Sequence, residues 1–151
     1  MSIDVADKKD LIKKQACFSQ LNDKECDILI ELLHEKNIKC GETIVMEGDI
    51  VDSVYLIVSG TADVRHVYLK NGVSEFQSIA QLGPEQAIGL NEFGFYSLSG
   101  VRTATVVALT DMTLLQFSVA AFHGFALAYP HVNEVMRKFA QIYLDKNLPN
   151  K

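Results

Sequence analysis

Cysteine is scarce in this chain, and its spacing excludes two kinds of small scaffold. The 151 residues include three cysteines, Cys17, Cys26 and Cys40, with no CxxC pair among them. An odd number without paired spacing supports neither a disulfide framework nor a zinc knuckle. We therefore expect all three to be small, buried apolar side chains in a protein of a reducing compartment.

Long apolar runs and an excess of basic residues are missing as well. No run approaches the ~18 residues that a membrane-spanning helix needs, and the polar first ten residues lack the apolar segment of a signal peptide. The formal net charge of -5 opposes binding to nucleic acids and anionic membranes, because both depend on Lys and Arg. We expect a cytoplasmic protein with no nucleic-acid or membrane partner, and a local basic pocket for one small anion stays open.

The sequence motifs of catalysis are also absent. There is no GxSxG elbow and no Walker or GxGxxG phosphate loop. His34, His66, His123 and His131 are isolated from one another, whereas a metal enzyme on a β-roll needs about three convergent ligands. His34 and His123 fall in segments that we expect to be helical, and the carboxylates between residues 42 and 52 have the spacing of turns. The sequence predicts no enzyme, no metal site and no cofactor.

The segments that are present predict helices at both ends of a single domain spanning residues 1–151. A chain of this length with 48% hydrophobic residues can bury one core. Residues 7–36 read as helical, with a short helix at Lys8 to Ala16 and a second that begins at the capping box of Asn22 and Glu25. Residues 119–145 read as two C-terminal helices, because apolar side chains recur at helical spacing from Val132 to Asp145.

Residues 37–118 predict a β-roll. Val54 to Val58 is a short apolar run typical of a buried strand. Asn71-Gly72 predicts a hairpin turn into a return strand at Phe76 to Leu82, because both residues tolerate positive φ. Arg102 to Leu109 is rich in β-branched residues, and Met112 to Phe117 returns after another turn. Seven or eight short strands with regular turns indicate a sandwich, jelly roll or barrel.

Several of these segments resemble the cyclic nucleotide-binding domain family. The resemblance lies in Gly41-Glu42-Thr43-Ile44, Val45-Met46-Glu47-Gly48-Asp49, Asp52-Ser53, Val54-Tyr55-Leu56-Ile57, Gly60, Leu82-Gly83-Pro84 and Arg102-Thr103-Ala104-Thr105-Val106. It runs from about Phe18 to about Lys138, and Val51 departs from it, standing where the family prefers a small residue. The resemblance implies a mainly β fold with flanking helices (α+β), an eight-stranded β-roll of the jelly-roll type. The order of elements expected from the residues alone is the same.

The resemblance also implies a ligand site, with a phosphate-binding cassette that is degenerate here. In the family an arginine pairs with the cyclic phosphate, and the glutamate of a Gly-Glu pair holds the ribose 2′-hydroxyl. Arg102 matches the arginine and Gly89 matches the glycine, but Leu90 stands in place of the glutamate. The site implied by the resemblance consists of Gly89, Leu90, Asn91, Glu92, Arg102 and Thr103. Backbone N–H groups from Gly89 to Asn91 would assist at the phosphate, and Glu92 would replace the missing ribose partner.

Two base contacts follow from the same resemblance. Thr103 would favour guanine over adenine, although a threonine in a β-branched strand needs no such explanation. Phe139 or Tyr143 of the last helix could cap the base by stacking.

Two interpretations of the cassette remain open at this point. Twelve residues separate Gly89 from Arg102, a longer stretch than the family usually has, and they include Phe93, Phe95 and Tyr96. In the first interpretation this loop still wraps a cyclic nucleotide. In the second, the aromatic side chains fill the pocket and Arg102 pairs with a local carboxylate.

The two interpretations lead to two functions. The first is a stand-alone regulatory module that binds cAMP, cGMP or a similar phosphorylated ligand and signals by movement of its C-terminal helix to a protein effector that is unknown. The second is a β-roll that binds no nucleotide and serves protein interaction. The apolar stripe of the last helix would pack on its own domain or, alternatively, pair with a second copy in a homodimer.

Overall fold

The computed structural model describes residues 3–91, 94–95 and 100–147. It describes the side chains of all these residues except 90, 91, 94, 95 and 139–147. The N-terminal part contains helix α1 (Val5–Lys13), the 3₁₀ turn η1 (Ala16–Phe18) and helix α2 (Asp23–Glu31). The predicted capping box is confirmed. Glu25 N donates to Asn22 Oδ1 and Asn22 N donates to Glu25 Oε1, both at 2.9 Å, which satisfies two free amides at the start of α2.

Eight strands form the predicted β-roll as two four-stranded antiparallel sheets. One sheet has the order β1-β10-β3-β6 and the other β2-β9-β4-β5. Their bounds are β1 His34–Ile38, β2 Thr43–Val45, β3 Ser53–Ser59, β4 Ala62–Lys70, β5 Val73–Leu82, β6 Ala87–Ile88, β9 Thr105–Ala108 and β10 Met112–Ser118. A further short pair, β7 (Leu90–Asn91) and β8 (Gly94–Phe95), lies outside both sheets. The mainly β fold with flanking helices is therefore confirmed.

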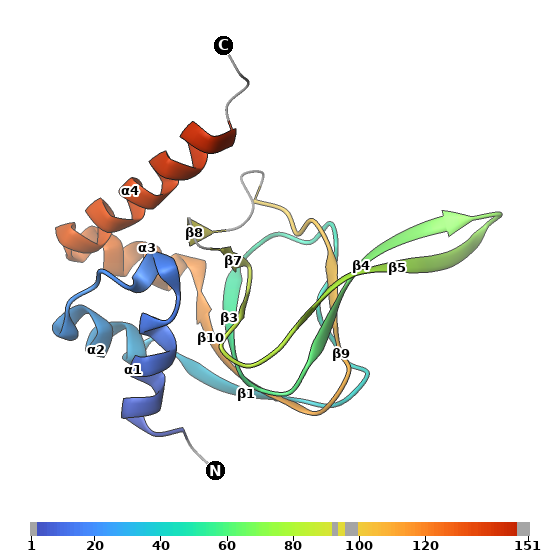
Figure 1. Cartoon of the computed structure of the whole chain (residues 1–151), viewed down its shortest axis with the longest axis horizontal. Helices are drawn as coiled ribbons and strands as arrows, with labels where there is room; N and C mark the ends of the chain where they lie inside the picture. The colour runs from blue at the N-terminus through green and yellow to red at the C-terminus, as the bar shows by residue number, and fades with distance from the viewer. Residues whose placement is uncertain (1–2, 92–93, 96–99, 148–151) are drawn as a thin grey trace.

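The β4–β5 hairpin turns where the sequence predicts it. Lys70 pairs with Val73 across Asn71 and Gly72, whose φ angles are 54° and 78°. The hairpin extends beyond the rest of its sheet, and in Figure 1 it points away from the helices. Most of its far half is solvent-exposed, because beyond the roll neither face of the ribbon is covered.

The helices and the first sheet share one hydrophobic core. Phe18, Phe117 and Phe122 stack with ring centroids 5.6 to 6.1 Å apart, joining η1, β10 and helix α3 (Val119–Ala128). Helix α4 (Pro130–Asn147) follows, and its Val132 and Val135 are buried in this core. The first turns of the last helix thus pack on their own chain.

The remaining stripe residues Phe139, Ile142 and Tyr143 lie beyond the side chains that the structure describes. Pairing of that part of the helix with a second copy stays a prediction. None of the helices in the described part of the chain is long and apolar enough to cross a membrane.

Three expectations for the first forty residues are wrong. His34 begins strand β1 and is not helical, because residues 34–38 pair with Gln116 to Met112 of β10, a long-range contact that overrides local preference. The first helix ends at Lys13, short of Ala16. Cys17 and Cys26 are buried as expected, and burial raises the pKa of the Cys17 thiol to about 12. Cys40, however, is exposed in the turn after β1, where its thiol donates to Leu109 O at 3.1 Å.

Candidate functional site

Arg102 is held in position by the backbone of the turn between β2 and β3. Its amide donates to Asp49 O at 2.7 Å, and its carbonyl accepts from Gly48 N at 2.9 Å. The neighbouring residues Ile50 and Val101 form an isolated antiparallel bridge. Because Val101 and Arg102 make these contacts with the turn instead of continuing the ladder, β9 begins only at Thr105. The expected strand from Arg102 to Leu109 is therefore three residues too long at its start.

Among the described residues, the buried Arg102 guanidinium donates to a carbonyl oxygen and forms one long ion pair with a carboxylate. Only 7% of the residue is exposed. Its Nη2 donates to Ser53 O at 2.8 Å, while the Asp52 Oδ1 oxygen stands 3.9 Å away on a side chain that is mostly in solvent. Burial lowers the pKa of this guanidinium, and Tyr55, Asp52 and Asp49 oppose that shift. Arginine stays protonated even so, and a buried cation is costly unless an anion or several acceptors surround it.

Gly89 lies directly against this guanidinium. It follows β6 with a φ of +87°, and a Cβ placed on it would stand 2.8 Å from Arg102 Nη1 and 3.4 Å from Ser53 O. A side chain at residue 89 would thus both strain the backbone and collide with the arginine. The close approach brings the backbone that leads into the cassette next to the cation.

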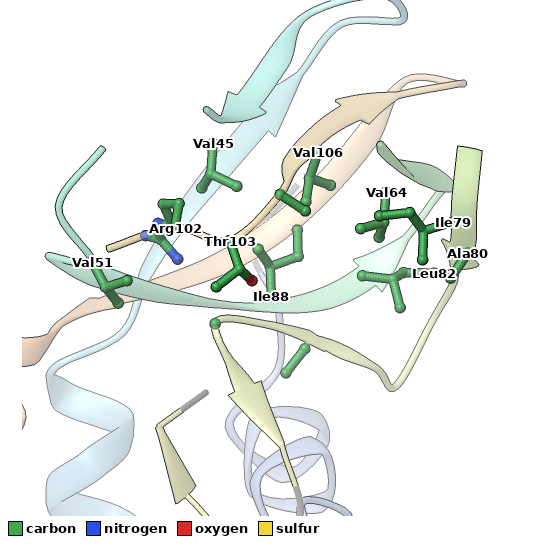
Figure 2. Close-up of a pocket in the computed structure, with 13 residues that line it drawn as sticks. Val45, Val51, Val64, Ile79, Ala80, Leu82, Ile88, Arg102, Thr103 and Val106 are labelled. Carbon is green, nitrogen blue, oxygen red and sulfur yellow. The ribbon is translucent and has the colours of Figure 1, made fainter. Parts of the chain in front are cut away.

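Arg102 and Gly89 line a pocket of about 280 Å³ between the inner face of the β2-β9-β4-β5 sheet and β6 of the other sheet. The volume is near the lower end of small-molecule sites, which start at about 300 Å³. The other described lining residues are small or aliphatic apart from one threonine: Val45, Val51, Val64, Ile79, Ala80, Leu82, Ala87, Ile88, Thr103, Ala104 and Val106. In Figure 2, Arg102 and Thr103 lie toward one end, and Val64, Ile79 and Leu82 lie toward the other. A ligand with one anionic end and one flat apolar end suits this division.

Thr103 lies in the pocket but not in a strand. It occupies a bend before β9 and is exposed. The expectation that it is an ordinary strand residue is wrong, because the ladder has not yet begun at this point. Its hydroxyl is thereby presented to the pocket, next to the arginine along the chain.

The structure brings together three of the six predicted site residues, Gly89, Arg102 and Thr103. Leu90 and Asn91 form β7 and pair with Phe95 and Gly94 of β8, respectively. Glu92, Phe93 and Tyr96 lie outside the described residues, and the side chains of Phe95, Phe139 and Tyr143 do too. The ribose contact of Glu92, the aromatic filling of the pocket and the stacking cap therefore stay predictions.

Sequence reasoning missed two features of the site. Ser53 contributes its carbonyl oxygen to Arg102, a role that no side-chain pattern can reveal. Ile79 lines the pocket because the β4–β5 register shifts there: Val64 pairs with Ala80 but Arg65 pairs with Ser78. Such a bulge re-aims a side chain. Among the described residues, no group of three His, Cys, Asp or Glu side chains could hold a metal.

Comparison with known proteins agrees with this geometry. The family model described as "Cyclic nucleotide-binding domain" matches residues 35–129, which is more than half of the chain. A cGMP-dependent protein kinase of Plasmodium berghei (strain Anka) is 36% identical over 63 residues, 42% of this chain and 7% of that protein. A cAMP-dependent protein kinase regulatory subunit of Yarrowia lipolytica (strain CLIB 122 / E 150) is 28% identical over 119 residues, 79% of this chain and 29% of that protein. The chain thus spans less than a third of either relative.

A solved structure supports the fold over nearly the whole chain. The N-terminal domain of a transcriptional regulator from Streptomyces coelicolor A3(2) superposes with a TM-score of 0.76 and 23% identity. The match covers 90% of this chain and 91% of that one. At this identity the likeness concerns the arrangement of sheets and helices, which is that of the β-roll described above.

Proposed function

The chain belongs to the cyclic nucleotide-binding domain family, and from that premise we propose that it is a regulatory module binding a cyclic nucleotide, cAMP or cGMP, or a similar phosphorylated ligand. Domains of this family are regulatory modules, and we assign no catalytic role to this one. A cytoplasmic location and a protein effector of unknown identity belong to the same proposal.

One observation carries the proposal: a buried guanidinium faces an otherwise apolar pocket. Within the described part of the chain, the carboxylate placed nearest to Arg102 is Asp52, at 3.9 Å and mostly in solvent. A cyclic phosphate would place a negative charge directly against the guanidinium and accept hydrogen bonds from it. Such a charge-assisted hydrogen bond contributes about 1.5–3 kcal/mol.

The apolar remainder of the pocket supports a nucleotide over a bare anion. Val45, Ile88 and Val106 flank the space beside Arg102, and the β4–β5 residues close its far end. A purine ring would bury its faces against such side chains, whereas inorganic phosphate would leave them uncovered. Thr103, with its hydroxyl in the pocket, is the proposed base contact. The two kinase relatives, one named for cGMP and one for cAMP, leave the choice of base to experiment.

Signalling would pass through the last helix. Its first turns are fixed by Val132 and Val135 in the core, and His131 Nδ1 lies 2.8 and 2.9 Å from the two carboxylate oxygens of Glu25 on α2. The later turns of α4 are then the part that a ligand would shift between two packings.

A thermal melt with and without millimolar cAMP or cGMP tests the proposal. A ligand at 100 times its dissociation constant stabilises the fold by about 2.7 kcal/mol, which raises the melting temperature by several degrees. We expect this rise in the wild type and its loss in Arg102→Ala. The exposed Arg137→Ala variant on α4 is the matched control and should retain it. No rise with either nucleotide in the wild type would leave the β-roll without this function and favour the protein-interaction alternative.

A further inference from the structure

The turn that leads into β6 contains a residue with a strained backbone. Gln86 N donates to Gly83 O at 3.2 Å, so Pro84 and Glu85 are the two central residues of this turn. Glu85 has a φ of +75°, and a positive φ at the second central position favours glycine or asparagine. Among the described residues, the one other non-glycine residue with positive φ is Asn71, in the β4–β5 hairpin turn. A glutamate at residue 85 therefore costs backbone free energy that a glycine would not.

The hydrogen-bonding groups of Glu85 all have partners, and two of these partners belong to the N-terminal helical part. Its amide donates to Ile57 O on β3 at 2.9 Å. Its carbonyl oxygen accepts from Gln15 Nε2 at 2.9 Å, and its carboxylate accepts from Lys14 Nζ. Lys14 caps the C-terminal end of α1, and Gln15 Nε2 also donates to Leu11 O at 3.3 Å. The strained residue thus connects the end of α1 to the β-roll.

The ion pair between Lys14 and Glu85 adds little to the stability of the fold. The two side chains are 49% and 58% exposed, and an ion pair in that much solvent contributes little. A glycine at residue 85 would fit the same backbone without strain, but it would offer Lys14 no carboxylate. A strained residue that brings no clear gain in stability is a candidate for a functional role.

Glu85 lies close to the ligand site along the chain. Gln86 and the two residues of β6 separate it from Gly89, and both residues of β6 line the pocket. Strand β6 is at the edge of its sheet and pairs only with β3, so strand pairing alone holds it weakly. The contacts at the start of this segment therefore help to determine how closely Gly89 approaches Arg102.

We propose that Glu85 is a positioning residue of the ligand site: Lys14 and Gln15 hold Glu85, which in turn keeps β6 and Gly89 against Arg102. The inference rests on the proposed function, because it assigns a role within that site. The N-terminal helical part then contributes to ligand affinity, although none of its described residues lines the pocket.

The variant Glu85→Gly separates positioning from stability. It should melt at or above the wild-type temperature, because glycine relieves the strain of the positive φ. It should nevertheless bind cAMP or cGMP about tenfold more weakly in calorimetric titration, because the turn becomes free and loses its carboxylate. Asn71→Gly is the matched control, since it relieves the other positive φ far from the pocket and should leave the dissociation constant unchanged. Wild-type affinity in Glu85→Gly, or a loss of affinity that accompanies an equally clear fall in melting temperature, would overturn the inference.

A charge exchange tests the contact with Lys14. Lys14→Glu and Glu85→Lys should each weaken nucleotide binding about threefold at low ionic strength, and the double variant should regain the wild-type affinity because it restores the pair in reverse. Lys9→Glu breaks another exposed ion pair of α1, with Asp27, and should leave affinity unchanged. Failure of the double variant to recover, or an equal loss in Lys9→Glu, would contradict the role of this pair.

Hydrogen exchange of the ligand-free chain distinguishes this inference from the proposed function. Residues 86–89 should exchange faster in Glu85→Gly than in the wild type, and at the wild-type rate in Asn71→Gly. If the wild type binds neither nucleotide, the proposed function fails, and this comparison still decides whether Glu85 positions β6. Equal exchange of residues 86–89 in Glu85→Gly and the wild type would overturn the inference.

Discussion

At the scale of single residues, the site depends on one close contact between a glycine and an arginine. Gly89 has positive φ and leaves no room for a Cβ beside Arg102 Nη1. Gly41 has nearly the same φ, +89°, but nothing lies within 4 Å of its would-be Cβ. Substituting each glycine with alanine therefore separates two free-energy costs: that of a strained backbone, present at both positions, and that of displacing Arg102, present only at Gly89.

Substituting these two glycines gives a prediction for the site. Gly41→Ala should cost about 1–2 kcal/mol of unfolding free energy, the price of a left-handed backbone for an L residue, and should leave ligand binding intact. Gly89→Ala should cost at least as much and also abolish the thermal response to cyclic nucleotide. Chemical denaturation and ligand-dependent melts measure both effects. Retained ligand response in Gly89→Ala would contradict the contact as the basis of the site.

The sequence predicted correctly those residues whose role depends only on their neighbours along the chain. Asn22 and Glu25 form a capping box, and Asn71-Gly72 forms a hairpin turn, because each needs only its neighbours along the chain. Arg102 and Gly89 came from the family pattern. The Ser53 carbonyl and the re-aimed Ile79 did not. The first depends on a contact with Arg102, far away in the sequence, and the second on a register shift between two paired strands, which no residue pattern encodes.

At the scale of elements, some strands are predicted by their own sequence and others form only through long-range pairing. The hydrophobic run of β3 and the β-branched run of β9 predict strands, whereas β1, with the sequence HEKNI, has no alternating apolar pattern. It is a strand because β10 supplies its partner. The local sequence preference agrees with the strand pairing in most of the roll and disagrees with it at the edge strand β1.

The β4–β5 element is reinforced by a buried carboxylate on the outer face of its sheet. Asp63 is 4% exposed; its Oδ2 accepts from Arg65 Nε at 2.7 Å and its Oδ1 accepts from Ser78 Oγ at 2.5 Å. The hydrogen bonds from Arg65 and Ser78 lower the pKa of Asp63 below its ordinary value. The charged form is therefore the one that stabilises the fold.

This gives a prediction for the acid limb of stability. Because the folded-state pKa is the lower one, the contribution of Asp63 is complete above the unfolded pKa of about 3.9 and is lost as pH falls through the folded value. Asp63→Asn should cost about 1.5–3 kcal/mol at neutral pH, and the difference from wild type should shrink below about pH 4. Asp27→Asn, which breaks the exposed pair with Lys9, should cost less than about 1 kcal/mol. A pH-independent Asp63→Asn effect in urea denaturation would contradict this account.

At the scale of the whole molecule, helices and roll meet in one core while the ligand pocket lies inside the roll. Figure 1 shows the helices on one side and the β4–β5 hairpin on the other. The ligand pocket borders the β2-β9-β4-β5 sheet. Helix α4 instead packs through Val132 and Val135 into the core that the helices share with the β1-β10-β3-β6 sheet. Strand β6 connects the pocket to the helix-facing sheet, since Ile88 lines the pocket and β6 pairs with β3 of that sheet.

Hydrogen exchange tests whether this connection transmits binding. Cyclic nucleotide should slow exchange at Gly89 to Asn91 by direct protection and should also change exchange in α4 beyond its anchored first turns. Mass spectrometry of the free and ligand-saturated chain measures both regions. Protection confined to the roll, with α4 unchanged, would contradict signalling through the last helix.

The central claim is that Arg102 makes this pocket a cyclic-nucleotide site, and calorimetric titration of cAMP and cGMP into wild type and Arg102→Lys measures it most directly. Lysine keeps the charge but cannot contact Ser53 O and a phosphate with one planar fork. The account predicts one saturable site in the wild type for at least one nucleotide, and about tenfold or weaker binding in a variant that still melts cooperatively. Equal affinity in the two proteins, or no binding by the wild type, would contradict it.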